Sequence, residues 1–113
     1  METPKGKNFK KYVCLYEALG TACLLITFNW SGPDAQAIAI SIFASIIMYG
    51  QVSGGHFNPA VTIAVFIKET FMNGNMASNL MMATIVILSQ LVGATAGVTF
   101  VGLILTHITP PIS

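Results

Sequence analysis

The sequence predicts an all-α membrane protein with three transmembrane helices and one re-entrant half-helix. Its 113 residues are 54% hydrophobic and only 8% charged, far below the ~25% charged residues typical of soluble domains. Three apolar segments also meet or approach the roughly 20 residues that a membrane-spanning helix needs. The net charge of +1 gives no case for nucleic-acid binding, and the length suits a single domain over 1–113.

The chain begins with a polar segment, 1–11, that carries several lysines. Because the cytoplasmic flanks of membrane helices are enriched in Lys and Arg, this segment predicts a tail on the cytoplasmic, or matrix-like, side of an unidentified membrane. The first span is expected at 12–30, with Glu17 as its one charged residue. A carboxylate at membrane depth is costly and marks a functional site by default. The alternative is an interfacial Glu17 whose side chain reaches outward to water.

The second span is expected at 35–49, after the turn signature Ser31-Gly32-Pro33-Asp34. It carries no charge. The following residues, 50–57, are polar and rich in glycine. They lie between two long apolar runs, yet they cannot themselves span a bilayer.

A short apolar segment at 58–67 reads as a half-helix. Asn58 is a good N-cap residue, and Pro59 fits the first helical position, where no N–H is needed. The segment makes about 15 Å of helix, roughly half of a ~30 Å hydrocarbon core. Irregular backbone followed by half a helix is tolerated at membrane depth only where it lines a cavity or is buried in protein. Residues 50–67 therefore predict a re-entrant loop, with a capped surface helix as the alternative.

The third span is expected at 76–106, and small residues on the spans suggest close helix contacts. Gly93 and Gly97 form a small-xxx-small pair on the third span, and Gly20 is expected to serve packing on the first. Cys14 and Cys23 are nine residues apart on one predicted helix, so they lie on opposite faces and act as small apolar residues. The sequence shows no metal-ligand cluster and no nucleophile–base arrangement. We therefore expect neither a cofactor nor enzyme activity.

The run from Ser53 to Thr62, Ser-Gly-Gly-His-Phe-Asn-Pro-Ala-Val-Thr, resembles the first Asn-Pro-Ala loop of the aquaporin and glycerol-channel family. Glu17-Ala18-Leu19-Gly20-Thr21 and Gln90-Leu91-Val92-Gly93-Ala94 resemble patterns of its first and third helices. The resemblance implies an aquaporin-like repeat that passes water or small neutral solutes. It further implies pore-facing Asn58, Pro59 and Ala60, a lining or constriction formed by Ile38, Gly54, Gly55 and His56, and loop support from Glu17 and Gln90.

Ile38 departs from the family pattern. Water-selective members commonly have an aromatic residue at this position, so an aliphatic side chain argues against strict water selectivity. The alternative is that Ile38 merely packs against lipid or a neighbouring helix.

The resemblance covers only one of the two inverted repeats that members of the family usually contain. A second Asn-Pro-Ala loop, a fourth to sixth span and a selectivity-filter Arg are absent from the sequence. We therefore expect the chain, in its lipid bilayer, to be completed by another membrane polypeptide, whether the chain is a fragment, a split half or a self-assembling half. The alternative function is a non-conducting structural accessory subunit of a membrane protein complex.

Overall fold

The structure, a computed structural model, describes residues 8–108, and these form four α-helices and no strand. The helices are α1 (Phe9–Ser31), α2 (Ala35–Ser53), α3 (Pro59–Asn73) and α4 (Met76–Ile108). By length and composition, the three helices α1, α2 and α4 could cross a membrane. The predicted class, an all-α integral membrane protein, is confirmed.

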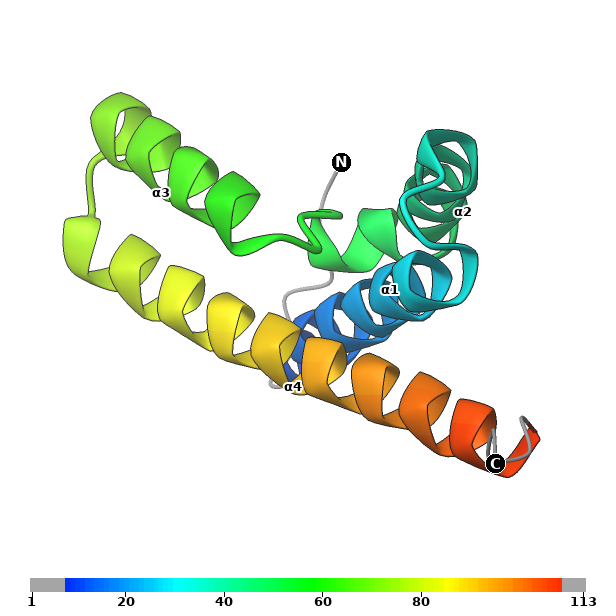
Figure 1. Ribbon diagram of the computed structural model, residues 1–113. Helices are drawn as coiled ribbons and strands as arrows, with labels where there is room; N and C mark the ends of the chain where they lie inside the picture. Colours follow the sequence, from blue (N-terminus) through cyan, green and yellow to red (C-terminus); the bar gives the residue numbers. More distant parts are fainter. Residues whose placement is uncertain (1–7, 109–113) are drawn as a thin grey trace.

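The longest helix, α4, forms the spine of the molecule (Figure 1). α1 packs across its middle, α3 packs along its N-terminal half, and α2 packs on α1. Within the described residues α2 and α3 do not contact each other; they diverge on either side of the loop that joins them (Figure 1). This divergence leaves one side of the molecule open.

Several predicted helix boundaries were wrong because polar or glycine residues were treated as ends. α1 starts at Phe9, inside the predicted 1–11 tail, whose residues 1–7 lie outside the described part. α2 runs to Ser53 rather than 49, because continuing the helix satisfies backbone groups that apolar surroundings would leave unpaired. α4 ends at Ile108, two residues beyond the predicted span.

α3 continues through Lys68-Glu69 to Asn73 instead of ending at 67. Lys and Glu are good helix formers, so these charges mark a change of surroundings and do not stop the helix. It stops at Gly74, whose φ of 72° is a conformation that residues with a Cβ rarely adopt. Its 15 residues make about 22 Å of helix, still short of a ~30 Å hydrocarbon core.

Small residues set the contact between α1 and α4. A Cβ at Gly93 would overlap the carbonyl group of Ala18, and one at Gly97 would lie 2.7 Å from the carbonyl oxygen of Ala22. Both glycines are buried. The absence of two side chains therefore lets the two backbones approach closely, as in other membrane helix pairs.

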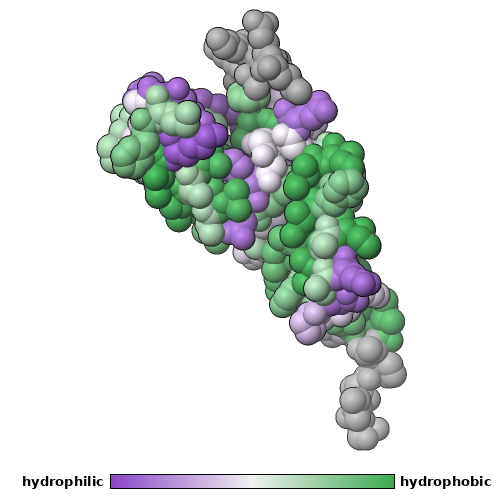
Figure 2. Space-filling model, turned by 90° about the horizontal axis from the view of Figure 1, so that it is seen from above, coloured by the Kyte–Doolittle hydropathy of each residue, from purple (hydrophilic) through white to green (hydrophobic). Residues whose placement is uncertain are grey.

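The distribution of polarity is the reverse of that in a soluble protein. The buried hydrophobic residues are few, whereas buried polar residues come from all four helices: Glu17, Thr21, Ser45, Ser53, Thr62 and Gln90. Large apolar side chains are exposed along the helices, and hydrophobic colour covers much of the surface in Figure 2. This pattern suits lipid, where apolar faces cost nothing and polar groups need partners inside the protein.

The N-terminus of α2 provides a first testable prediction. Asp34 Oδ1 accepts hydrogen bonds from Gln36 N at 3.0 Å and Ala37 N at 3.2 Å. Asp34→Ala removes this cap and is expected to lower the free energy of unfolding by about 1 kcal/mol, measured by thermal unfolding in detergent micelles with circular dichroism. Asp34→Asn keeps the cap and is the matched control. If both variants lose the same stability, the charge of Asp34, and not its cap, is what matters.

Candidate functional site

The loop between α2 and α3 has five residues, 54–58. Gly54, with φ of 93°, ends α2 and donates its N–H to Gly50 O at 2.9 Å. Gly55 also has a positive φ, 70°, so consecutive glycines make the sharp turn. Phe57 follows with φ of 52°, an uncommon conformation for a side chain of this size.

Phe57 is held in this conformation by a slot in α1. Its ring lies where a Cβ at Gly20 would be, and the residue is only 4% exposed. The ring also packs edge-on against Tyr49, with centroids 6.4 Å apart. Gly20 is thus a packing residue that lets the loop pack against α1, whereas Gly93 and Gly97 let α1 pack closely against α4.

Glu17 anchors the backbone of the loop and is fully buried, at 0% exposure. Its Oε1 accepts from His56 N at 3.0 Å, and its Oε2 accepts from Phe57 N at 2.8 Å and Gln90 Nε2 at 2.9 Å. Three donors match an ionised carboxylate, which only accepts hydrogen bonds. The adjacent N-terminus of α3 adds a partial positive charge that favours an anion at this place.

Gln90 and Thr62 extend this arrangement to α3 and α4. Gln90, 1% exposed, also donates from Nε2 to Thr62 Oγ1 at 2.9 Å. Thr62 Oγ1 contacts His56 Nδ1 at 3.1 Å and donates to Asn58 O at 3.2 Å. One connected set of hydrogen bonds therefore joins α1, the loop, α3 and α4.

Asn58 caps α3 with its side chain. Its Oδ1 accepts from Ala60 N at 2.8 Å, and Pro59 occupies the first helical position. The Asn58 side chain is exposed. The capped N-terminus of α3 is thus formed by Asn58, Pro59 and Ala60.

A cavity of about 290 Å³ lies beside the loop and is lined by all four helices. Its polar lining includes Gln51, Ser53, His56, Glu69 and Asn79. In Figure 2, hydrophilic colour appears in the hollow between two apolar masses. The cavity can therefore offer hydrogen bonds in an otherwise apolar molecule.

The structure brings most of the predicted site residues together, but Ile38 lies apart. Gly54 and His56 line the cavity, and Glu17 and Gln90 meet behind the loop, whereas Ile38 is half-buried in the first turns of α2 and does not line it. The sequence analysis missed Thr62 and Phe57. Thr62 is four residues after Asn58, so it lies one helical turn along the same face, which is a signal that could have identified it.

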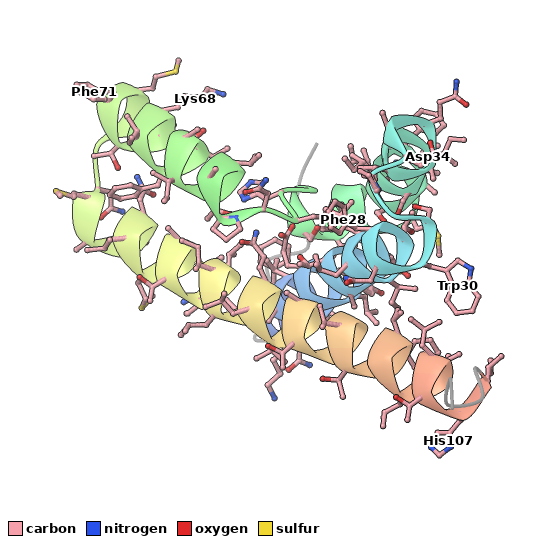
Figure 3. All side chains as sticks on the ribbon, viewed as in Figure 1. Phe28, Trp30, Asp34, Lys68, Phe71 and His107 are labelled. Atoms are coloured by element: carbon pink, nitrogen blue, oxygen red, sulfur yellow. The ribbon has the colours of Figure 1, made fainter. Side chains whose placement is uncertain are left out.

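Glu69 lines the cavity, whereas the ionisable residues labelled in Figure 3 lie away from this site. Figure 3 shows Lys68 near the far end of α3, and Asp34 and His107 at the opposite side of the view. Within residues 8–108 no group of three or more His, Cys, Asp or Glu side chains is placed to hold a metal ion. Cys14 and Cys23 are free thiols.

Comparison with known proteins supplies the family. The sequence model of the family described as "Major intrinsic protein" matches residues 11–111. The chain belongs to the major intrinsic protein family. Similar members of this family are an aquaglyceroporin of Toxoplasma gondii, 29% identical over 84% of the chain, and aquaporin-2 of Dugong dugon, 35% identical over 68% of the chain.

A further relative, "Glycerol uptake facilitator protein-like 6" of Lactiplantibacillus plantarum, is 41% identical over 45% of the chain. These matches cover 35% of the aquaglyceroporin, 61% of the aquaporin and 24% of the facilitator-like protein. This member of the major intrinsic protein family therefore spans less than two thirds of the length of each of them. No solved structure gave a significant match to the chain.

Proposed function

We propose that this chain forms one wall of a passive membrane channel for water or small neutral solutes, and that a second membrane polypeptide forms the other wall. Family membership supports a channel. The names of the relatives, two of which refer to glycerol and one to an aquaporin, support water or glycerol as the solute class. Such a channel needs polar groups that replace the hydrogen bonds of a passing solute, and no covalent step.

The observation that carries the proposal is the amide of Asn58. Because Oδ1 is engaged by Ala60 N, the Nδ2 hydrogens are left as donors on the open side of α3. The N-terminus of α3 also carries roughly half a positive elementary charge. A donor beside a positive helix end suits the oxygen of water or of an alcohol and disfavours cations.

The loop backbone supplies acceptors beside this donor. Within residues 8–108, no hydrogen bond reaches the carbonyl oxygens of Gly54, Gly55 or His56. Free carbonyls next to a donor allow a solute to exchange its water contacts for protein contacts as it moves. Ile38, several turns away along α2, is proposed to constrict the channel at its other end.

The positions of the lysines support an orientation with the N-terminus on the cytoplasmic or matrix-like side. Phe9 and Glu69 line the same cavity, which brings Lys10 and Lys68, their neighbours in sequence, to the same region of the molecule. Lys and Arg concentrate at the inner ends of membrane helices. In this orientation the loop and α3 form a re-entrant element.

The open side of the molecule supports a covering polypeptide. Gln51 and Asn58 are exposed there and His56 is half-buried. Leaving such groups against lipid without hydrogen-bond partners is costly. A membrane polypeptide with a complementary polar face removes this cost and closes the channel.

The test is osmotic water flux, followed by light scattering in vesicles from cells that produce the chain and from matched cells that lack it. Asn58→Asp is expected to lower the additional flux at least about tenfold, equivalent to about 1.4 kcal/mol in barrier height. Aspartate keeps the cap, but it removes the donor and adds a negative charge. Gln36→Glu, the same chemical change in the first turn of α2, is the matched control and is expected to leave the flux unchanged.

The purified chain alone, reconstituted in liposomes, is expected to give no flux above empty liposomes, because one wall does not enclose a pore. Flux from the purified chain that Asn58→Asp abolishes would refute the need for a second polypeptide. Equal flux in vesicles with and without the chain would instead favour the non-conducting accessory subunit.

A further inference from the structure

The hydrogen bonds around the Thr62 hydroxyl bear on which ring nitrogen of His56 carries the proton. Thr62 Oγ1 lies 2.9 Å from Gln90 Nε2, 3.1 Å from His56 Nδ1 and 3.2 Å from Asn58 O. A hydroxyl donates one hydrogen and accepts two. The Gln90 nitrogen can only donate and the Asn58 carbonyl can only accept, so His56 Nδ1 is the one partner whose role is open.

The orientation of the Gln90 amide is fixed by Glu17. Gln90 Nε2 donates to Glu17 Oε2 at 2.9 Å as well as to Thr62. Reversing the amide would place Gln90 Oε1 against the carboxylate, with two acceptors facing each other. Gln90 therefore acts as a donor to Thr62, and it fills one of the two acceptor positions of the hydroxyl oxygen.

Two arrangements of the remaining hydrogens are possible. In the first, Thr62 donates to Asn58 O and accepts from His56 Nδ1–H, so all three contacts are hydrogen bonds. In the second, Thr62 donates to His56 Nδ1, and its oxygen faces Asn58 O at 3.2 Å with no hydrogen between them. Asn58 O accepts from Thr62 N in both. The additional hydrogen bond favours the first arrangement by roughly two- to tenfold in population.

We propose that Thr62 and Gln90 hold His56 in its Nδ1–H tautomer, so that Nε2 faces the cavity as a hydrogen-bond acceptor. His56 and Gly54 both line the cavity, and Nε2 lies 3.4 Å from the position of a Cβ built on Gly54. Within residues 8–108, Nε2 makes no hydrogen bond. Thr62 and Gln90 are thus positioning residues that act through His56.

The hydrogen-bonding roles of the lining residues also give the cavity a preference among solutes, and this inference rests on the proposed function. Asn79 donates both of its amide hydrogens, to Thr70 Oγ1 at 3.3 Å and Gly74 O at 2.9 Å. It therefore offers only its oxygen, and Glu69 offers a carboxylate, while the Gln51 amide and the Ser53 hydroxyl can each donate or accept. With His56 Nε2 as a third acceptor, the cavity favours small neutral solutes that donate hydrogen bonds, such as alcohols, over ethers of similar size.

The tautomer can be measured by long-range ¹H–¹⁵N correlation on ¹⁵N-histidine-labelled protein in micelles. The measurement is made at about pH 9, above the range in which histidine changes charge. The chain has two histidines, and His107, exposed near the end of α4 (Figure 3), is assigned with His107→Gln. We expect a pyridine-type Nε2 and a pyrrole-type Nδ1 for His56. A pyrrole-type Nε2 would overturn the proposal.

Two variants test the cause. Thr62→Val removes the hydroxyl and is expected to lower the ratio of Nδ1–H to Nε2–H at least twofold, whereas Thr62→Ser keeps the hydroxyl and the wild-type ratio. An unchanged ratio in Thr62→Val would show that the hydroxyl does not select the tautomer. Because this readout needs no transport, a chain with the expected tautomer and no flux would refute the proposed function and leave the tautomer assignment standing.

The solute preference is tested separately, in vesicles with measurable flux. The permeability ratio of glycerol to its methyl ether is expected to fall at least twofold in Thr62→Val and to stay unchanged in Thr62→Ser. An unchanged ratio in Thr62→Val, together with a changed tautomer, would overturn the preference for donor solutes.

Discussion

Glu17→Ala is expected to lower the free energy of unfolding by at least about 3 kcal/mol. The substitution leaves three donors, His56 N, Phe57 N and Gln90 Nε2, without their acceptor. Each buried unsatisfied group costs about 1–3 kcal/mol, and the site is fully buried, with Glu17 at 0% exposure. The measurement is unfolding of the chain in mixed micelles, followed by circular dichroism as the fraction of denaturing detergent rises.

Glu69→Gln is the matched control for this prediction. Glu69 is partly exposed on α3, and its Oε2 accepts from Asn73 Nδ2, so the change should alter stability by less than about 0.5 kcal/mol. Glu17→Gln should remain destabilising, because an amide nitrogen would face one of the three donors. Equal stability of Glu17→Ala and the wild type would mean that the loop does not depend on this carboxylate.

The second large effect is expected for Gly93→Ala. The new methyl group would overlap the carbonyl of Ala18, so α1 and α4 must separate where they pack together. Overpacking of this kind costs about 1–3 kcal/mol. The cost should be near the upper end, because the obstacle is backbone and not the end of a flexible side chain. The same micelle unfolding experiment measures it.

Gly102 provides the control on the same helix. A Cβ at Gly102 meets nothing within 4 Å, and alanine forms helix more readily than glycine by up to about 1 kcal/mol. Gly102→Ala should therefore be neutral or slightly stabilising. If both variants behave alike, helix propensity explains them and close packing at Gly93 does not.

Much of the architecture followed from the sequence because its signals are local. Apolar runs located the membrane-length helices, and Asn58-Pro59 located the start of α3 through cap chemistry that involves only neighbouring residues. The helix ends were less accurate. Residues 50–53 and 68–73 were assigned wrongly because polarity indicates where a helix meets water, whereas a helix ends where its backbone changes direction, at Gly54 and Gly74.

The sequence by itself determined that this chain is an all-α membrane protein with a buried carboxylate candidate and a capped helix after a glycine-rich loop. Only the tertiary structure decided what the loop rests on. Phe57 occupies the slot at Gly20, and Gln90, 73 residues away from Glu17 in sequence, joins it to Thr62. Such contacts depend on how α1 and α4 cross, and no local pattern specifies that crossing. A carboxylate and donors from distant segments satisfy one another there because membrane surroundings offer them no other partners.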